Sequence, residues 1–501
     1  MDYQTLSHVR ALLRSVWLWP ALAMLLIGLL RIARPELWRD EIASWSAADR
    51  DLGRLLGMLA NVDASNGAYY VLLHFWTEVF GDSVLSLRMP SVLAMAGAAA
   101  FTALTAQRLF DSRAAGLAAG LLAATVPLVS RFAQEARSYA VVTCAVAAAC
   151  WLLLRALDRP GVGRWALYAL AMAVAGCFHL VSLSSLAGQL PLVLARWWGG
   201  RREPGAGRLP GQFALAVLAA LVPAVPVAVY GERQSARQLG WLPTPTAHDL
   251  RYFWHTLLSP DREMYVFAVL ALLALLHPRF ARGAVQALLL AVLPVLVVWV
   301  ASQGTTSYFT ERYLLFTVPA LAGLAGGGVA AAAALLGRLT TRPPAVTAAL
   351  ALIAVPLVLG APRQLQQRTL LAHGHRDFAG AAAVIAAGYR PGDGIVAPGG
   401  DQAWAMVGPG ISFYLPGSVR PVPMFVERDA VRADDLHAVP CPVADRCVGP
   451  APRTWVVTIG TGENPYEGLP GDQIEALQHT FVPPRIQRLP GLTVSLLVRK
   501  A

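Results

Sequence analysis

Long apolar runs recur along most of this chain, and they constrain its fold more than any other feature. A helix that crosses a bilayer needs about 20 mainly apolar residues, because every backbone polar group in lipid must be paired within the segment. Eleven runs approach this length, although the fifth and eighth are short and the fifth and sixth can be read as one broken helix. The runs cover residues 16–33, 88–108, 114–130, 139–157, 165–178, 181–197, 213–230, 265–277, 285–301, 313–336 and 345–361. We therefore expect an α-helical polytopic membrane protein with about eleven membrane-spanning helices.

Charge is scarce and unevenly placed. Only 14% of the residues are charged, against about 25% in soluble domains. The net charge of +11 comes largely from arginines in every second loop between the runs, and such loops face the cytoplasm. The alternation predicts a plasma-membrane protein with a cytoplasmic N-terminus, surrounded by membrane lipids, and it explains the basic charge without a nucleic-acid partner.

Two regions lie on the outer side in this topology. The loop over residues 34–87 contains leucines and aromatic residues at helical spacing, which predicts amphipathic helices at the membrane interface. Residues 362–501 are richer in Gly, Pro and charge. They contain several β-like runs and one helical segment, which covers residues 472–480. The β-like runs cover residues 394–397, 454–459 and 492–498. We expect a transmembrane domain over residues 1–361 and a small extracytoplasmic α/β domain over residues 362–501.

Two cysteines lie in this C-terminal region, at Cys441 and Cys447. They complete no zinc-binding spacing with other cysteines or histidines. Disulfides persist in oxidising compartments outside the cell. The spacing and the compartment therefore predict a local disulfide between the two.

Two adjacent carboxylates, Asp40 and Glu41, follow the first apolar run. On the outer side they cannot be topology signals, and neighbouring carboxylates repel each other and lose hydration at a membrane surface. A cation, a metal ion or a substrate hydroxyl that needs a base would explain them. The alternative is a solvated helix N-terminus, where the helix dipole favours acidic residues.

Further polar residues lie at the outer ends of other runs. Arginine suits bidentate phosphate binding, and the alternative is snorkelling to lipid headgroups with a local ion pair. A lone histidine at a helix break is a candidate ligand or simply an interfacial helix-end residue. The candidates are Glu135, Arg137 and Tyr139 before the fourth run, His179 between the fifth and sixth, and Arg312 and Tyr313 at the start of the tenth.

Several segments together resemble the GT-C superfamily of membrane glycosyltransferases, in the branch of the protein O-mannosyltransferases and the lipid A aminoarabinose transferase. No nucleotide-binding motif occurs, so an enzyme with acids outside the cell would need an activated substrate that arrives through the lipid. The resemblance covers residues 16 to about 330, and Asn66-Gly67-Ala68 departs from the prolines common in relatives. The matching segments are residues 37–41, 66–76, 80–82, 87–91, 134–140, 311–314 and 319–320.

The resemblance implies an inverting glycosyltransferase that moves a mannose-like or other monosaccharide from a polyprenyl-phosphate carrier to a hydroxyl on a glycan, lipid or protein acceptor. Asp40 would be the general base and Glu41 would assist it. Arg137 and Arg312 would stabilise the lipid phosphate that leaves, and the other candidates would bind substrate.

Two questions stay open at this point. A divalent metal ion held by Asp40 and Glu135 could also stabilise the charge on the leaving phosphate, but these carboxylates alone do not define a metal site. A lipid-linked glycan transporter or flippase is the alternative function, because charges at the membrane edge also mark translocation paths. Against it, the sequence shows neither an inverted repeat nor paired broken helices.

Overall fold

The structure is a computed structural model, and it describes residues 14–202, 206–258, 262–339 and 342–501. The chain divides into two compact units. The first comprises residues up to Leu30, Ala64–Tyr69 and Arg88–Gln366, and the second comprises Arg31–Asp63, Tyr70–Leu87 and Gln367–Ala501. The loop after the first apolar run thus groups mainly with the C-terminal region.

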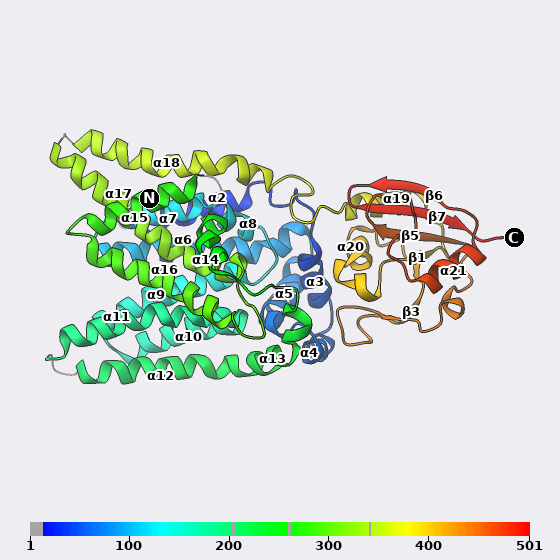
Figure 1. The fold of residues 1–501 in the computed structure, drawn as a ribbon, viewed down its shortest axis with the longest axis horizontal. Helices are drawn as coiled ribbons and strands as arrows, with labels where there is room; N and C mark the ends of the chain where they lie inside the picture. The colour runs from blue at the N-terminus through cyan, green and yellow to red at the C-terminus, as the bar shows by residue number, and fades with distance from the viewer. Residues whose placement is uncertain (1–13, 203–205, 259–261, 340–341) are drawn as a thin grey trace, which may run out of the picture. The chain divides into compact units, whose positions relative to one another are not determined.

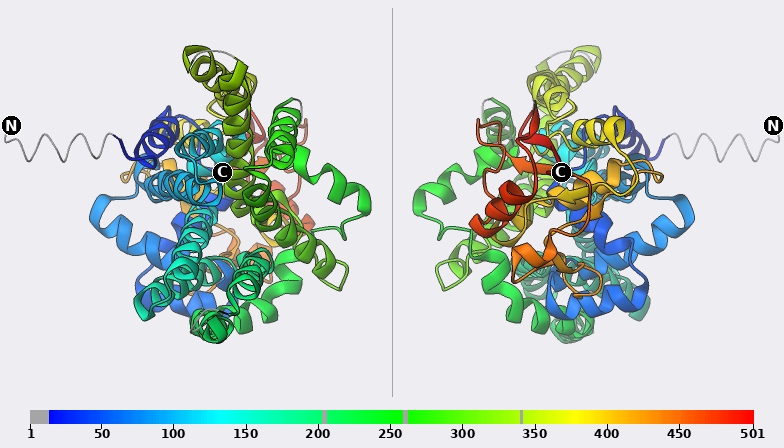
Figure 2. Two further views of the ribbon diagram at one scale, coloured as in Figure 1. Left: turned by 90° about the vertical axis from the view of Figure 1, so that its left-hand side faces the viewer. Right: turned by 90° about the vertical axis from the view of Figure 1, so that its right-hand side faces the viewer.

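The first unit is helical, and Figures 1 and 2 show its long helices running side by side. Close neighbours include α7 with α17, α9 with α10, and α11 with α16. The helices are α2 (Leu18–Leu29), α6 (Val84–Phe110), α7 (Arg113–Thr125), α8 (Pro127–Ala133), α9 (Tyr139–Asp158), α10 (Val162–Phe178), α11 (Ser185–Gly200), α12 (Leu209–Leu221), α13 (Val225–Leu239), α14 (Ala247–Leu258), α15 (Glu263–Leu276), α16 (Ala281–Ala301), α17 (Val318–Leu339) and α18 (Arg342–Gln366). Short 3₁₀ segments η2 (Leu180–Ser184), η4 (Val222–Ala224) and η5 (Glu311–Thr317) join some of them.

Small residues let these helices approach closely, as is usual in membranes. A Cβ at Gly326 of α17 would lie 2.5 Å from the carbonyl oxygen of Ala115 in α7. The Ala-rich composition of the runs therefore serves packing as well as hydropathy.

Within the described residues, six helices are long and apolar enough to cross a membrane, or seven if the bent pair α7 and α8 is one span. Three more predicted runs form shorter apolar helices, at Leu18–Leu29, Val162–Phe178 and Glu263–Leu276. The predicted class, a polytopic helical membrane protein, is confirmed. The predicted count of eleven spans is not, because turns and 3₁₀ breaks cut several runs below the length that a crossing needs.

The second unit combines the predicted outer helices with the C-terminal sheet. Helices α3 (Arg39–Ala48), α4 (Leu52–Asn61) and α5 (Gly67–Phe80) confirm the helical loop, with α5 beginning in residues of the first unit. A five-stranded sheet has the order β2-β1-β5-β7-β6, in which β2, β1 and β5 are parallel and β7 is antiparallel to both of its neighbours, β5 and β6. Its strands are β1 (Gly394–Val396), β2 (Val422–Pro423), β5 (Arg453–Ile459), β6 (Arg485–Leu489) and β7 (Leu492–Val498).

Three helices lie in the same unit as this sheet (Figure 1): α19 (Phe378–Gly388), α20 (Val407–Tyr414) and α21 (Gly471–Thr480). A separate ribbon pairs β3 (Val426–Arg428) with β4 (Val439–Pro440). The three predicted β runs and the predicted helix are all present, because their apolar alternation and flanking turns are local signals. The disulfide between Cys441 and Cys447 is also present, as predicted.

Candidate functional site

The first unit brings together residues from three separate sequence motifs. Arg137 lies in the turn between α8 and α9, His179 lies at the break between α10 and η2, and Arg312 lies in the first turn of η5. The His179 ring centroid lies 4.5 Å from that of Tyr313 and 6.0 Å from that of Tyr139. The two tyrosine rings are 6.2 Å apart. Five of the candidates therefore share one neighbourhood, which we call the arginine cluster: Arg137, Tyr139, His179, Arg312 and Tyr313.

The electrostatics of the arginine cluster are those of a cationic site. Burial, followed by the charges of Arg137 and Arg312, lowers the pKa of His179 to about 3. The imidazole is therefore neutral at physiological pH, and its Nδ1 is buried without a hydrogen-bond partner among the described residues. The Arg312 guanidinium also lies 5.2 Å from the ring of Trp241, a residue between α13 and α14 that the sequence did not point to. Two guanidiniums near one histidine, one of them against the rings of Trp241 and Tyr313, favour an anion such as phosphate.

Hydrogen bonds to the main chain fix the turn that carries Arg137. The carbonyl oxygen of Glu135 accepts hydrogen bonds from Ser91 Oγ at 2.6 Å and from the Arg137 N–H at 2.9 Å. Gln134 Nε2 donates to the carbonyl oxygen of Leu30 at 2.8 Å. These contacts hold the backbone that leads into the arginine, which helps to preorganise this part of the site.

Glu135 has a structural partner of its own. Its carboxylate is fully buried and lies 2.6 Å from Arg131 Nη1. Such a buried pair is costly to break, because the remaining charge would be left in low dielectric. In this structure Glu135 therefore supports the turn, and its predicted contact with substrate stays a prediction.

The acidic pair lies in the second unit, in the first turn of α3. This position agrees with the helix-dipole alternative as well as with a catalytic role. The Asp40 carboxylate lies 3.3 Å from Arg39 Nε, and its side chain keeps 18% of its surface exposed. Glu41, in contrast, is fully buried, with Oε2 3.8 Å from His373 Nδ1. The two carboxylates are therefore in different environments despite being neighbours.

His373 is a residue that sequence reasoning undervalued. The segment 373–377 opens the C-terminal region, and its last residue, Asp377, caps α19: its Oδ1 accepts from the Gly380 N–H at 2.5 Å. His373 is buried, and its Nε2 lies 3.1 Å from the carbonyl oxygen of Gln367. Its contact with Glu41 joins segments that are distant in the sequence, so no local sequence pattern predicts this contact.

A metal site at the acids is not supported by their surroundings. Across the described residues, no group of three or more His, Cys, Asp and Glu side chains could hold a metal ion. Asp40 has Arg39 beside it and Glu135 has Arg131, and an adjacent guanidinium competes with a cation for the carboxylate. We derive no step through a metal.

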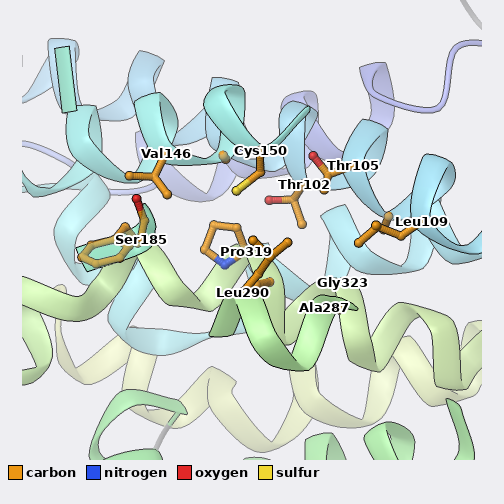
Figure 3. Close-up of a pocket in the computed structure, with 14 residues that line it drawn as sticks. Thr102, Thr105, Leu109, Val146, Cys150, Ser185, Ala287, Leu290, Pro319 and Gly323 are labelled. Carbon is orange, nitrogen blue, oxygen red and sulfur yellow. The ribbon is translucent and has the colours of Figure 1, made fainter. Parts of the chain in front are cut away.

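A small cavity lies among the helices of the first unit (Figure 3), and no residue of the arginine cluster lines it. Thr102 and Thr105 of α6 and Cys150 of α9 line one side, and Leu290 and Pro319 line another. Its volume is about 20 Å³, little more than one water molecule needs on this measure. It is a packing void, too small for a sugar or an isoprenoid unit.

Comparisons with known proteins agree with this architecture. Residues 68–230 match the family model of dolichyl-phosphate-mannose-protein mannosyltransferases. The structure is similar to ArnT from Cupriavidus metallidurans bound to undecaprenyl phosphate, with a TM-score of 0.61, 16% identity, and coverage of 96% of this chain and 98% of that chain. The apo state of the same ArnT gives a TM-score of 0.57 at 16% identity, covering 94% and 96% of the two chains.

A more distant similarity is to the oligosaccharyltransferase of Archaeoglobus fulgidus in complex with Zn and sulfate. It has a TM-score of 0.50 and 11% identity, and it covers 96% of this chain and 73% of that chain. The search of curated proteins finds no sequence match. The expected resemblance is confirmed at the level of fold: the chain has an ArnT-like fold, and part of it matches the mannosyltransferase family model.

Proposed function

We propose that the protein is an inverting glycosyltransferase that moves a monosaccharide from a polyprenyl-phosphate carrier to a hydroxyl acceptor on the outer face of the membrane. The observation that carries the proposal is the arginine cluster, where Arg137 and Arg312 lie close enough to the half-buried His179 for their charges to lower its pKa. The leaving group of such a transfer is a lipid phosphate, and preorganised guanidiniums stabilise the charge that develops on it. The fold is shared with an ArnT that was solved bound to undecaprenyl phosphate, which supports this class of donor.

In the proposed reaction Asp40 removes the proton of the acceptor hydroxyl as its oxygen attacks the anomeric carbon. The bond from that carbon to the lipid phosphate breaks, and the phosphate leaves as an anion. Glu41 is buried against His373, and we propose that it helps to hold the first turn of α3. The proposal names both substrates by class only. The donor carries a mannose-like or other monosaccharide, and the acceptor is a glycan, a lipid or a protein.

The experiment is a transfer assay with reconstituted protein and a panel of polyprenyl-phosphate sugars. Asp40→Asn should lower turnover by about 10²–10⁴-fold, the usual cost of losing a general base, while donor binding is largely kept. Arg137→Ala should raise the donor KM as well as slow turnover. Wild-type rates from Asp40→Asn would remove Asp40 from the mechanism.

A transporter is the alternative function. The same reconstituted protein and polyprenyl-phosphate sugars distinguish a transporter from a transferase. A flippase moves a labelled polyprenyl-phosphate sugar across the bilayer of a vesicle and leaves its glycosidic bond intact. The proposed enzyme cleaves that bond and releases free polyprenyl phosphate. Movement of the lipid without cleavage, lost in Arg137→Ala, would favour the transporter.

We also propose that the N-terminus is cytoplasmic and that residues 34–87 and 362–501 are outside, as the arginine loops predict. Single cysteines at Asp51, Gly207 and Gly462 can be labelled in intact cells with an impermeant reagent. We expect labelling at Asp51 and Gly462 and protection at Gly207. The reverse pattern would invert the topology and place the acids in the cytoplasm.

A further inference from the structure

A second pair of arginines lies in the second unit, beside the acidic pair and separate in sequence from the arginine cluster. Arg39 opens α3, and Arg376 lies in the segment before α19. Their guanidinium carbons lie 4.8 Å and 5.2 Å from the ring centroid of Trp404. Both cations therefore contact the same indole, which is 48% exposed.

This arrangement places like charges together at a cost. Burial and the charge of Arg39 both lower the pKa of Arg376. Arg39 has Asp40 as an ionic partner, but no carboxylate forms an ion pair with Arg376 within the part of the chain that the structure describes. The face of Trp404 offsets part of the repulsion through cation–π attraction. It supplies no full negative charge, so an excess of positive charge remains.

The two arginines line a cavity in the second unit with a volume of about 170 Å³. One water molecule needs about 10–15 Å³ on this measure, so the cavity has room for a group of several heavy atoms. Its lining is Trp38, Arg39, His373, Gly374, Arg376 and Phe378. The walls thus combine two guanidiniums and aromatic surface, with no carboxylate among them.

The backbone holds the Arg376 side of this cavity in place. The Asp377 N–H donates to the carbonyl oxygen of Pro490 at 3.0 Å, one residue beyond the arginine. Gly374 packs against Trp38, because a Cβ at Gly374 would lie 2.9 Å from the Trp38 Cβ. The guanidinium of Arg376 therefore extends from a fixed backbone segment, which limits the conformational entropy lost when an anion binds.

We propose that Arg39 and Arg376 form an oxyanion site for a phosphate-type group, carried either by the acceptor or by a lipid headgroup. Guanidiniums match the geometry of phosphate oxygens, and an anion would relieve the repulsion between the two. The site is adjacent to Asp40 through Arg39. Its assignment to the acceptor rests on the proposed transferase function, while the binding of an oxyanion does not.

The first test measures binding of inorganic phosphate to the full-length protein in a phosphate-free maltoside detergent, by equilibrium dialysis. Arg376→Gln should weaken one class of phosphate sites about tenfold or more, since a hydrogen bond to a charged group contributes on that scale. Arg376→Lys, which keeps the charge, should recover part of the affinity. The matched control is Arg432→Gln, because Arg432 is 80% exposed and pairs with Asp429 in the same unit.

The second test distinguishes the sources of the anion. In nanodiscs of phosphatidylglycerol, a headgroup in the site would abolish the phosphate binding that depends on Arg376. An acceptor site would keep that binding, and Arg376→Gln would then raise the acceptor KM in the transfer assay without changing the donor KM. Thermal unfolding confirms that each variant is folded.

The proposal is overturned if folded Arg376→Gln binds phosphate as wild type does, or if wild type has no saturable phosphate binding at all. Failure of the transferase function has a different signature. In that case no polyprenyl-phosphate sugar is cleaved by wild type, while the difference in phosphate binding between wild type and Arg376→Gln persists.

Discussion

Replacement of Arg312 by alanine tests the arginine cluster most directly. The change removes one of two guanidiniums proposed to hold the donor phosphate, and it leaves Arg137 in place. A hydrogen bond to a charged group contributes about 1.5–3 kcal/mol, which corresponds to about 10- to 150-fold in affinity. We expect kcat/KM for the donor to fall by that factor and the acceptor KM to stay unchanged. The donor kcat/KM of Arg312→Lys should lie between those of wild type and Arg312→Ala, because lysine keeps the charge but lacks the planar guanidinium.

The assay measures initial rates over a range of donor concentrations in proteoliposomes. Arg233→Ala is the matched control, since Arg233 is an exposed arginine whose guanidinium lies 5.9 Å from the ring of Tyr230, outside the cluster. If Arg137 and Arg312 hold one phosphate, the double variant should lose less than the two single losses combined. A donor kcat/KM within twofold of wild type in Arg312→Ala, or additive losses in the double variant, would refute a shared phosphate site.

Two predictions concern the second unit. Burial is the main cause that raises the pKa of Glu36 to about 7, and Asp377 adds to it, so its stabilising contribution is complete below about pH 4.5 and is lost as pH rises through 7. Glu36→Gln should therefore raise the melting temperature at pH 8 but not at pH 4; an equal change at both pH values would contradict this. Asp393 is buried and accepts hydrogen bonds from Arg453 Nε at 2.9 Å and Nη2 at 2.6 Å, so Asp393→Ala should destabilise the sheet region by about 3–5 kcal/mol, measured by denaturant unfolding. A loss below about 1 kcal/mol would show that Arg453 finds another partner.

Local sequence patterns predicted local structure well. Apolar alternation located β5 and β7, helical spacing located α4 and α5, and a short cysteine spacing located the disulfide. These features depend on neighbouring residues, so their periodicity is visible in the sequence. The number of spans was less predictable, because hydropathy does not show where a turn or a 3₁₀ segment interrupts an apolar run.

The site was predictable only in part, for a related reason. Their positions at the ends of apolar runs made Arg137, His179 and Arg312 candidates, and the structure brings these three together. The contact of His373 with Glu41 and the contact of Arg376 with Trp404 join segments that no motif connects. Such contacts depend on how the C-terminal sheet and α3 pack within the second unit, and a single sequence gives no spacing rule for them.

The environments of the candidate bases support one assignment among the four. His179 is a poor base near neutral pH, because its pKa is lowered to about 3 and an efficient base has a pKa near the working pH. Glu135 is fully buried against Arg131, and Glu41 is fully buried beside His373, so a hydroxyl from outside can reach neither without displacing its partner. Asp40 keeps 18% of its side chain exposed, with Arg39 beside it. Access therefore favours Asp40 as the base.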